Sequence, residues 1–404
     1  MTDRAPDRVT AGVTDGVTAG VTDGVLLARA AWSRLVEPGD AVAGALVAAL
    51  GPQDALDWLR RAGPLPTLGA TDGRARAMLA AAAERWRTRL PTLDPERDLG
   101  MLDRLGGRLL VPESRGWPDG IADLGPAAPM CLWVRGTADD QRLQATLRRS
   151  VAVVGARACT AYGEHVGAEL AAGVAAEGWC VVSGGAYGVD AVAHRAALAA
   201  SGPTVAFLAG GVDRLYPAGN TELLRAVADA GALVAEVPPG SVPAKVRFLQ
   251  RNRLIAAVSC ATVVVEAAWR SGALSTARHA SALLRPVGAV PGPVTSASSA
   301  GCHRLLRDGA AVCITDAAEL LELVGPVPAP EPVGDRRVDD GLDLVVRRTL
   351  DALPLRRAAS EESVARAAGL SEREVRAALG RLELVGLAVR DGAAWRRAHH
   401  RGPG

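Results

Sequence analysis

The chain has 404 residues, of which 49% are hydrophobic and 22% are charged, and its formal net charge is only +2. This length and composition indicate a globular protein of two or three domains and argue against a largely disordered chain. No stretch of about 18 apolar residues is free of charge, and the start of the sequence lacks the pattern of an export signal, so we expect a cytoplasmic protein without a membrane span.

The six cysteines show no C-x-x-C spacing, and several of them lie in apolar runs. We therefore expect buried thiols in a reducing compartment, with neither a disulfide nor a metal site. The Walker-type G-x-x-x-x-G-K-[ST] motif is absent, and no G-x-G-x-x-G follows the first predicted strand. These absences favour a protein without an ATP or dinucleotide cofactor.

The first 110 residues contain two kinds of sequence. Residues 1–25 repeat Val-Thr-Ala-Gly-Val-Thr-Asp-Gly, and so much glycine without large apolar groups predicts a disordered tail. From residue 26 to 110 the pattern becomes helical, and breaks at glycine and proline predict a small helical domain. The clearest predicted helices are Ala41–Leu50, Asp54–Arg61 and Ala75–Leu90.

Between residues 111 and 324, short apolar runs alternate with amphipathic segments of helix length. This alternation predicts an α/β fold, a Rossmann-like doubly wound parallel sheet with helices on both faces. The predicted strands are Val151–Val154, Cys180–Ser183, Thr204–Leu208, Ala232–Ala235, Ala261–Val265 and Pro286–Val290.

Glycine, serine and arginine recur directly after these strands, for example in Gly155–Arg157 and Ser183–Asp190. In doubly wound sheets, ligands bind beyond the carboxyl ends of the strands. Glycines allow close approach of the backbone, free N–H groups at helix starts donate to oxygens, and arginine supplies a fork of donors, so the edge suits phosphate. The alternative is that each glycine only makes a tight turn. The acidic Asp213, Glu236 and Glu266 are expected to cap turns or shape the groove.

The segment 241–285 carries seven basic residues against the single acidic Glu266, on a chain that is otherwise nearly neutral. Such local charge favours a polyanion ligand, although a solvated basic face is the alternative. At its centre, Arg251, Asn252 and Arg253 precede an apolar run, so we expect these three residues where a loop enters a helix, a suitable place to hold an anion.

After residue 324, a proline-rich stretch predicts a stiff linker over 325–341. Residues 342–397 then predict a winged-helix domain with helices at Leu342–Leu350, Glu361–Ala368 and Ser371–Leu384, and a hairpin at Val389–Trp395. Ser371 and Glu374 form a capping-box pattern. The third helix has three arginines and three glutamates, which is poor for a major groove. This balance favours a protein-contact or weak duplex-contact module over a sequence-specific repressor.

Taken together, these motifs resemble the DNA-processing protein A (DprA/Smf) family over residues 114–324. The matching segments are Val154–Arg157, Ser183–His194, Gly211–Pro217 with Asn220, Phe248–Arg253, Arg270–Thr276, Pro291–Gly292 with Gly301–Arg304, and, upstream, Trp117–Pro118 and Leu132–Gly136. The chain departs from the family pattern at Ala156, Tyr187 and Leu249, where serine, arginine and proline are usual. Tyr187 removes one charge from the expected groove.

The resemblance implies a protein that binds single-stranded DNA, protects it and loads the RecA recombinase on it during natural transformation or recombination. It also implies a homodimer formed by the Rossmann-like domains, for which the segment Gly301–Cys313 is a candidate. Arg157 would clamp a phosphate, and Phe248 would stack a base or, alternatively, anchor its helix in the core. The implied DNA-binding residues are Gly155, Arg157, Ser183, Gly184, Gly185, Lys245, Phe248, Arg251, Asn252, Arg253, Ser271, Gly272 and Thr276.

A competing interpretation is an enzyme. Asp190 and His194 stand four residues apart, so on one helix face they could form an acid–base pair, and phosphoribohydrolases share a related Rossmann fold. Their typical Pro-Gly-Gly-x-Gly-Thr loop is absent here, however, and no nucleophile or metal-ligand cluster accompanies the pair. We therefore expect no catalytic residue.

Overall fold

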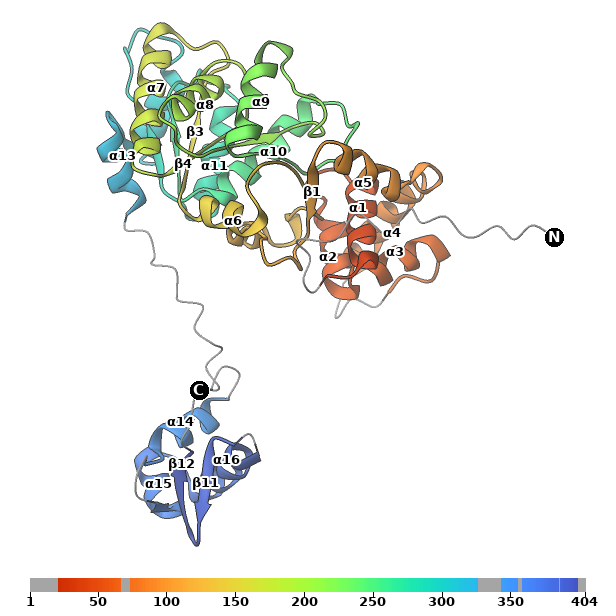
Figure 1. The fold of residues 1–404 in the computed structure, drawn as a ribbon, viewed down its shortest axis with the longest axis vertical. Helices are drawn as coiled ribbons and strands as arrows, with labels where there is room; N and C mark the ends of the chain where they lie inside the picture. The colour runs from red at the N-terminus through yellow and green to blue at the C-terminus, as the bar shows by residue number, and fades with distance from the viewer. Residues whose placement is uncertain (1–20, 67–72, 326–342, 355–357, 385, 399–404) are drawn as a thin grey trace, which may run out of the picture. The chain divides into compact units, whose positions relative to one another are not determined.

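The structure, a computed structural model, describes residues 21–66, 73–325, 343–354, 358–384 and 386–398 (Figure 1). The chain divides into two compact units, 1–327 and 328–404, which are described separately. None of the helices in the described ranges is both long and apolar enough to cross a membrane. All but the first residue of the expected linker over 325–341, and most of the expected disordered tail, lie outside the described residues.

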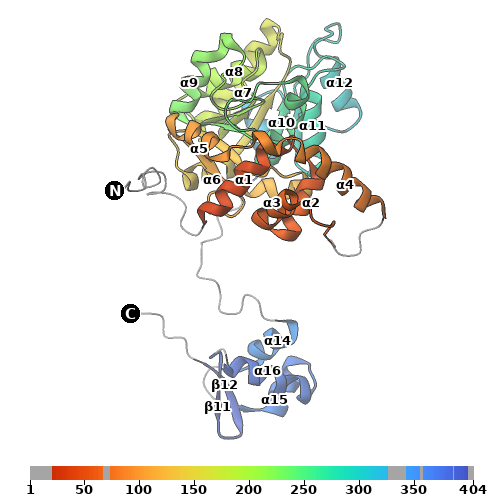
Figure 2. The same ribbon diagram turned by 90° about the vertical axis from the view of Figure 1, so that its right-hand side faces the viewer.

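The first unit opens with a cluster of five helices that lies next to the β1 edge of the sheet (Figures 1 and 2). Their core includes an edge-to-face contact between Trp32 and Trp86, whose ring centroids lie 5.4 Å apart. Helix α1 begins at Asp23, inside the range expected to be disordered, and the aspartate suits the positive end of the helix dipole. The elements are α1 (Asp23–Leu35), α2 (Ala41–Leu50), α3 (Pro52–Arg61), α4 (Gly73–Arg87), the 3-10 turn η1 (Leu90–Thr92) and α5 (Pro95–Arg104).

A nine-stranded sheet forms the body of this unit, in the order β1-β2-β6-β5-β4-β3-β7-β8-β9. From β6 to β9 all neighbouring strands are parallel, whereas β1 and β2 join antiparallel. The strands are β1 (Gly107–Leu110), β2 (Leu132–Gly136), β3 (Ser150–Val154), β4 (Cys180–Ser183), β5 (Thr204–Leu208), β6 (Ala232–Ala235), β7 (Ala261–Val264), β8 (Val287–Ala289) and β9 (Val312–Cys313).

Helices cover both faces of the sheet. Side chains of α7, α8 and α13 pack against one face of β3, β4 and β7, and side chains of α6, α10, α11 and α12 pack against the other face. The remaining segments are η2 (Asp119–Ala127), α6 (Asp140–Arg148), α7 (Ala161–Ala176), α8 (Val189–Ala199), η3 (Ala218–Asn220), α9 (Thr221–Ala230), α10 (Lys245–Val258), α11 (Ala273–Ala282), α12 (Ala300–Arg307) and α13 (Ala317–Val324).

All six apolar runs singled out in the sequence form strands of this mostly parallel sheet. The prediction missed β1, β2 and β9, which lie at the two margins of the sheet. Residues 107–110, assigned from the sequence to the helical domain, pair with β2 and so belong to the sheet. All six cysteines are free, and Cys131, Cys180 and Cys302 are buried.

The described residues of the second unit form three helices and a three-stranded sheet of order β10-β12-β11 around an apolar core. The predicted capping box is confirmed, because Ser371 Oγ and the Ser371 amide both donate to Glu374 and the Glu374 amide donates back to Ser371 Oγ. The elements are α14 (Leu344–Ala352), β10 (Ala359–Ser360), α15 (Glu361–Ala368), α16 (Glu372–Leu384), β11 (Ala388–Asp391) and β12 (Ala394–Arg397).

Candidate nucleic-acid interface

A pocket of about 620 Å³ opens beyond the carboxyl ends of the parallel strands. Its walls come from the loop after β3, the loop after β5 and the segment that leads from β6 into α10. Because these segments meet only in the folded chain, the pocket combines residues up to 91 positions apart in sequence. It is lined by Arg157, Arg214, Leu215, Tyr216, Val242, Pro243, Lys245 and Phe248.

Arg157, Phe248 and Tyr216 form the polar and aromatic centre of this pocket. The Arg157 guanidinium lies 4.6 Å from the centroid of the Phe248 ring, and the Tyr216 and Phe248 rings are 5.9 Å apart. Phe248 is half-buried and belongs to none of the buried core clusters, so its ring faces the pocket and does not anchor the helix from within.

Two exposed cations at the pocket lack an acidic partner. Arg157 and Lys245 form no ion pair with any described carboxylate, although the same unit contains many arginine–carboxylate pairs. Lys245 is the first residue of α10, and no side chain caps that helix start. Unpaired positive charge next to an aromatic ring is an arrangement suited to a phosphate with an attached base.

The triplet Arg251, Asn252 and Arg253 lies in the middle of α10, which begins six residues earlier at Lys245, so its expected place at a loop–helix junction was wrong. All three side chains are buried and bind protein groups. Arg251 donates to the Phe207 carbonyl, Asn252 to the Gly272 carbonyl, and Arg253 to both oxygens of Glu236 at 2.6 and 2.7 Å. The triplet therefore fixes α10 beneath the pocket and does not line its surface.

Arg251 explains the glycine in the loop after β4. A Cβ on Gly184 would lie 1.7 Å from Arg251 Nη1, so only glycine leaves room for the guanidinium. Burial lowers the pKa of Arg251 to about 10, although the nearby charge of Asp190 opposes this shift. Neighbouring Ser183 and Gly185 are also buried, and Ser183 Oγ donates to the Val153 carbonyl.

The start of α7, which follows β3, is occupied by an internal carboxylate. Glu266 accepts from the Thr160 amide at 2.9 Å and from Thr160 Oγ1 at 2.7 Å, and it is almost fully buried. Helix starts after the first strand often bind phosphate in doubly wound folds. Here Glu266 holds that position, and Gly155 packs directly against the backbone of Glu266 and the Val189 side chain.

The loop after β7 contributes Ser271 and Gly272, which lie partly or fully exposed before α11. Ser271 Oγ accepts from the Ala273 amide at the start of α11 at 3.3 Å, and the Gly272 carbonyl accepts from Asn252. Thr276, one turn further, is only 1% exposed and cannot touch a ligand without a rearrangement.

Asp190 and His194 do not form an acid–base pair. Asp190 accepts from the Ala186 amide, and His194 Nδ1 pairs with Thr204 Oγ1 at 2.7 Å. Burial, together with the charge of Arg251, lowers the pKa of His194 to about 3. A fully buried imidazole with so low a pKa is a weak base and does not reach a substrate in the pocket.

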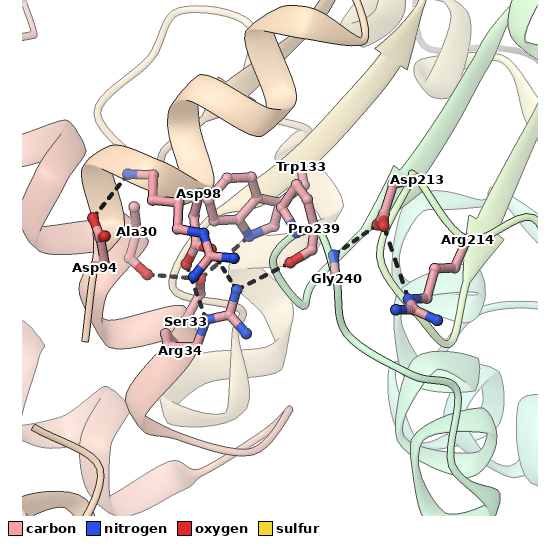
Figure 3. A network of polar contacts seen from close by, with 11 residues as sticks. Ala30, Ser33, Arg34, Asp94, Asp98, Trp133, Asp213, Arg214, Pro239 and Gly240 are labelled. Carbon is pink, nitrogen blue, oxygen red and sulfur yellow. Dashed lines mark hydrogen bonds and ion pairs between the residues drawn. The ribbon is translucent and has the colours of Figure 1, made fainter. Parts of the chain in front are cut away.

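The helical cluster contacts the loop that leads into one wall of the pocket (Figure 3). Arg34 of α1 donates to Asp98 of α5 at 2.5 and 2.9 Å and to the Pro239 carbonyl at 3.0 Å. On the other side of the same loop, Asp213 accepts from the Gly240 amide at 2.8 Å. Pro239 and Gly240 precede the pocket residues Val242 and Pro243, so both contacts fix one wall of the pocket.

Sequence reasoning missed Arg214 and Tyr216 as pocket residues. Both stand inside the Gly211–Pro217 segment already noted for its motif, and the run Arg214-Leu215-Tyr216 after a predicted strand was the available signal. Tyr187, at the position where the family usually has arginine, is 49% exposed and accepts from the Gly219 amide. It therefore supports the loop after β5 with a hydrogen bond instead of supplying a charge.

The sequence of this chain matches a family model and several known proteins. Residues 108–325 match the family model described as DNA recombination-mediator protein A. A Mycobacterium tuberculosis protein that carries the DprA name is 47% identical over 379 residues, which are 90% of this chain and 92% of that protein.

Two further relatives cover smaller parts of the chain. Protein Smf of Escherichia coli is 40% identical over 195 residues, or 48% of this chain and 50% of that protein. The crystal structure of DNA processing protein A from Streptococcus pneumoniae superposes with a TM-score of 0.56 at 26% identity, and covers 75% of this chain and 98% of that one. The shared fold includes the mostly parallel sheet that carries the pocket.

Proposed function

Since the chain belongs to the DNA recombination-mediator protein A family, we propose that it binds single-stranded DNA at the pocket beyond the parallel strands. The ligand is the sugar-phosphate backbone together with unpaired bases, recognised without regard to sequence. The proposed role of the complex is to protect the strand and to load a RecA-type recombinase on it.

The observation that carries this proposal is the contact between Arg157 and Phe248. A guanidinium 4.6 Å from a half-exposed ring offers one group for a phosphate and one for a base. Paired bases inside a duplex present no free face, so a stacking site of this kind favours single strands. Lys245 adds a second unpaired positive charge at the same rim.

A second copy of the chain is the proposed structural partner. Strand β9 ends the sheet, and its residues Val312 and Cys313 are exposed, with Val312 54% accessible. An exposed edge strand is a ready template for pairing with another chain. The expected dimer segment Gly301–Cys313 contains this strand, which supports a homodimer formed by the Rossmann-like domains.

The domain limits predicted from the sequence are also part of this proposal. Residues 26–104 would act as a helical domain that supports the pocket wall, since residues 107–110 belong to the sheet, and residues 342–397 would act as a winged-helix domain. The β11–β12 hairpin would be the wing, and α16 would be the helix placed for contact with a partner. Its equal numbers of arginine and glutamate favour a protein partner or weak duplex contact.

The test is binding of the full chain to one oligonucleotide as a single strand and as a duplex, across a series of salt concentrations. We expect tighter binding of the single strand, equal affinity for different sequences, and a steep loss of affinity with salt as counterions are released. Equal or tighter binding of the duplex of the same length would refute the proposal.

A further inference from the structure

The exposed aromatic residues of the first unit collect at one edge of the sheet. All three tyrosines of the chain are at least 39% exposed, and they follow β3, β4 and β5: Tyr162, Tyr187 and Tyr216. Phe248 follows β6. Trp269, which follows β7, is 53% exposed. Five neighbouring strands of the sheet therefore each lead to one accessible aromatic side chain at their carboxyl ends.

Trp269 is unusual among the tryptophans. The chain has eight of them, all in the described ranges, and the other seven are buried or half-buried. A large apolar ring that costs free energy in water is expected to be covered in the functional state. The pocket around Phe248 does not include this ring.

Arg304 of α12 holds one face of the Trp269 ring. The guanidinium lies 4.7 Å from the ring centroid, and Arg304 forms no ion pair with a described carboxylate. The α12 helix is fixed beside this loop, because the Gly301 amide donates to the Ala267 carbonyl at 2.7 Å. Trp269 and Arg304 therefore repeat the aromatic–guanidinium arrangement of Phe248 and Arg157.

A hydrogen bond from a side chain of α10 to the loop after β7 links the two arrangements. Asn252, one helical turn after Phe248, donates to the carbonyl of Gly272, three residues after Trp269. Exposed Arg270 follows Trp269 directly in the sequence and also lacks a described acidic partner. The loop after β7 therefore carries an unpaired positive charge directly after the Trp269 ring in the sequence.

We propose that Trp269, held by Arg304, is a second base-stacking platform that takes a nucleotide further along the strand bound at Phe248. This inference rests on the proposed function. The pocket residue Tyr216 follows β5, and β5 and β7 are three strand spacings apart, or roughly 14 Å. A strand that keeps the rise of about 3.4 Å per nucleotide spans this distance with roughly four nucleotides. Only a ligand longer than that reaches both platforms.

The test compares the full-length wild type with Trp269→Leu on single strands of about 4 and about 16 nucleotides. We expect equal affinity for the short strand and about 5- to 150-fold weaker binding of the long strand by the variant, the effect of one lost stacked base. Arg304→Met should reduce the salt slope for the long strand by about 0.7 and leave the short strand unaffected.

Trp58→Leu is the matched control. Trp58 also packs against an arginine, Arg87, at 5.8 Å, but lies in the helical cluster away from the strand ends. This variant should bind both lengths like the wild type. In a parallel measurement, the long strand should quench tryptophan emission of the wild type, and Trp269→Phe should abolish the quenching.

Three results would overturn the second platform: unchanged binding of both lengths by Trp269→Leu, equal loss for both lengths, or quenching that persists in Trp269→Phe. If Phe248→Ala weakens binding of both strand lengths while Trp269→Leu weakens binding of neither, the binding site at Phe248 is supported and only the second platform is refuted. A wild-type protein that binds neither length would instead refute the proposed function, and this inference with it.

Discussion

Arg157 and Phe248 perform different physical tasks although they touch each other. Replacing Arg157 by alanine should weaken binding of every single-stranded sequence alike and reduce the salt slope by about 0.7, because one phosphate contact is lost. Phe248→Ala should keep the slope and lose roughly 1–3 kcal/mol of binding free energy. Binding isotherms at several salt concentrations measure both effects.

An abasic oligonucleotide is the control for stacking, because it should bind wild type and Phe248→Ala with nearly equal affinity. Phe248 is half-buried and lies outside the core clusters, so the variant should melt close to the wild type. A variant that melts much earlier but keeps full affinity would assign Phe248 to the core.

His194 makes stability depend on pH. Its pKa is about 3 in the folded protein, against 6.5 for an unperturbed histidine, because burial excludes the charged form. Below pH 6.5 the unfolded chain binds a proton that the folded chain does not. The free energy of unfolding is therefore unaffected by this histidine above pH 6.5. It decreases as the pH falls from 6.5 towards 3, by up to about 1.4 kcal/mol per pH unit.

His194→Gln should remove this contribution, so its free energy of unfolding should fall less steeply between pH 6.5 and 5 than that of the wild type, as measured by urea denaturation. His165→Gln is the control, because the His165 side chain is 70% exposed. Parallel pH profiles of His194→Gln and wild type would show that another group titrates.

At the scale of elements, the contact between α1 and the loop after β6 links the helical cluster to the pocket. Arg34→Met would leave the nearly buried Asp98 carboxylate without its partner and the Pro239 carbonyl without its donor. We expect a loss of about 1–3 kcal/mol in stability and weaker binding of single strands.

Combining Arg34→Met with Asp98→Leu separates the two effects. The double variant removes the unpaired carboxylate, so its melting temperature should recover. Its affinity should stay low, because no donor holds the Pro239 carbonyl and the wall of the pocket that follows it. Recovery of full affinity would show that the loop needs no support from α1.

The elements that the sequence predicts best are those with a strong local pattern. Buried parallel strands such as β5 are continuous apolar runs, and α2 is an unbroken apolar helix ended by glycine, so both were predicted with their observed bounds. Strand β9 has two residues, both exposed, and carries no such pattern. Its place in the sheet comes from pairing with β8, a contact that a local sequence window cannot contain.

The site was predictable to a similar degree. Arg157 and Phe248 were predicted as binding residues because they stand at strand ends and helix starts. It could not show that Arg251 points inward to Phe207 and Arg253 to Glu236, because that depends on which face of α10 meets the sheet. Three neighbouring polar residues in a helix look alike in sequence, whether they face solvent or buried partners.

At the scale of the whole molecule, the pocket lies entirely in the first unit. A chain that ends at Gly325 should fold and keep most of its affinity for single strands, because every pocket residue precedes that position. Gel filtration, melting curves and binding isotherms measure these outcomes. A truncated protein that folds and binds no oligonucleotide would place the site elsewhere or make the second unit essential.

Lys245 gives the molecule an unusual chemical property. It is the only lysine of the chain, it is exposed, and it stands at the rim of the pocket. Reagents that acylate amines can therefore modify a single side chain in addition to the α-amino group, which can be blocked beforehand. Mass spectrometry then measures the fraction of Lys245 that is acylated. In a mixture of the protein with any nucleic acid, a decrease in this fraction reports the share of molecules in which the pocket rim is occupied.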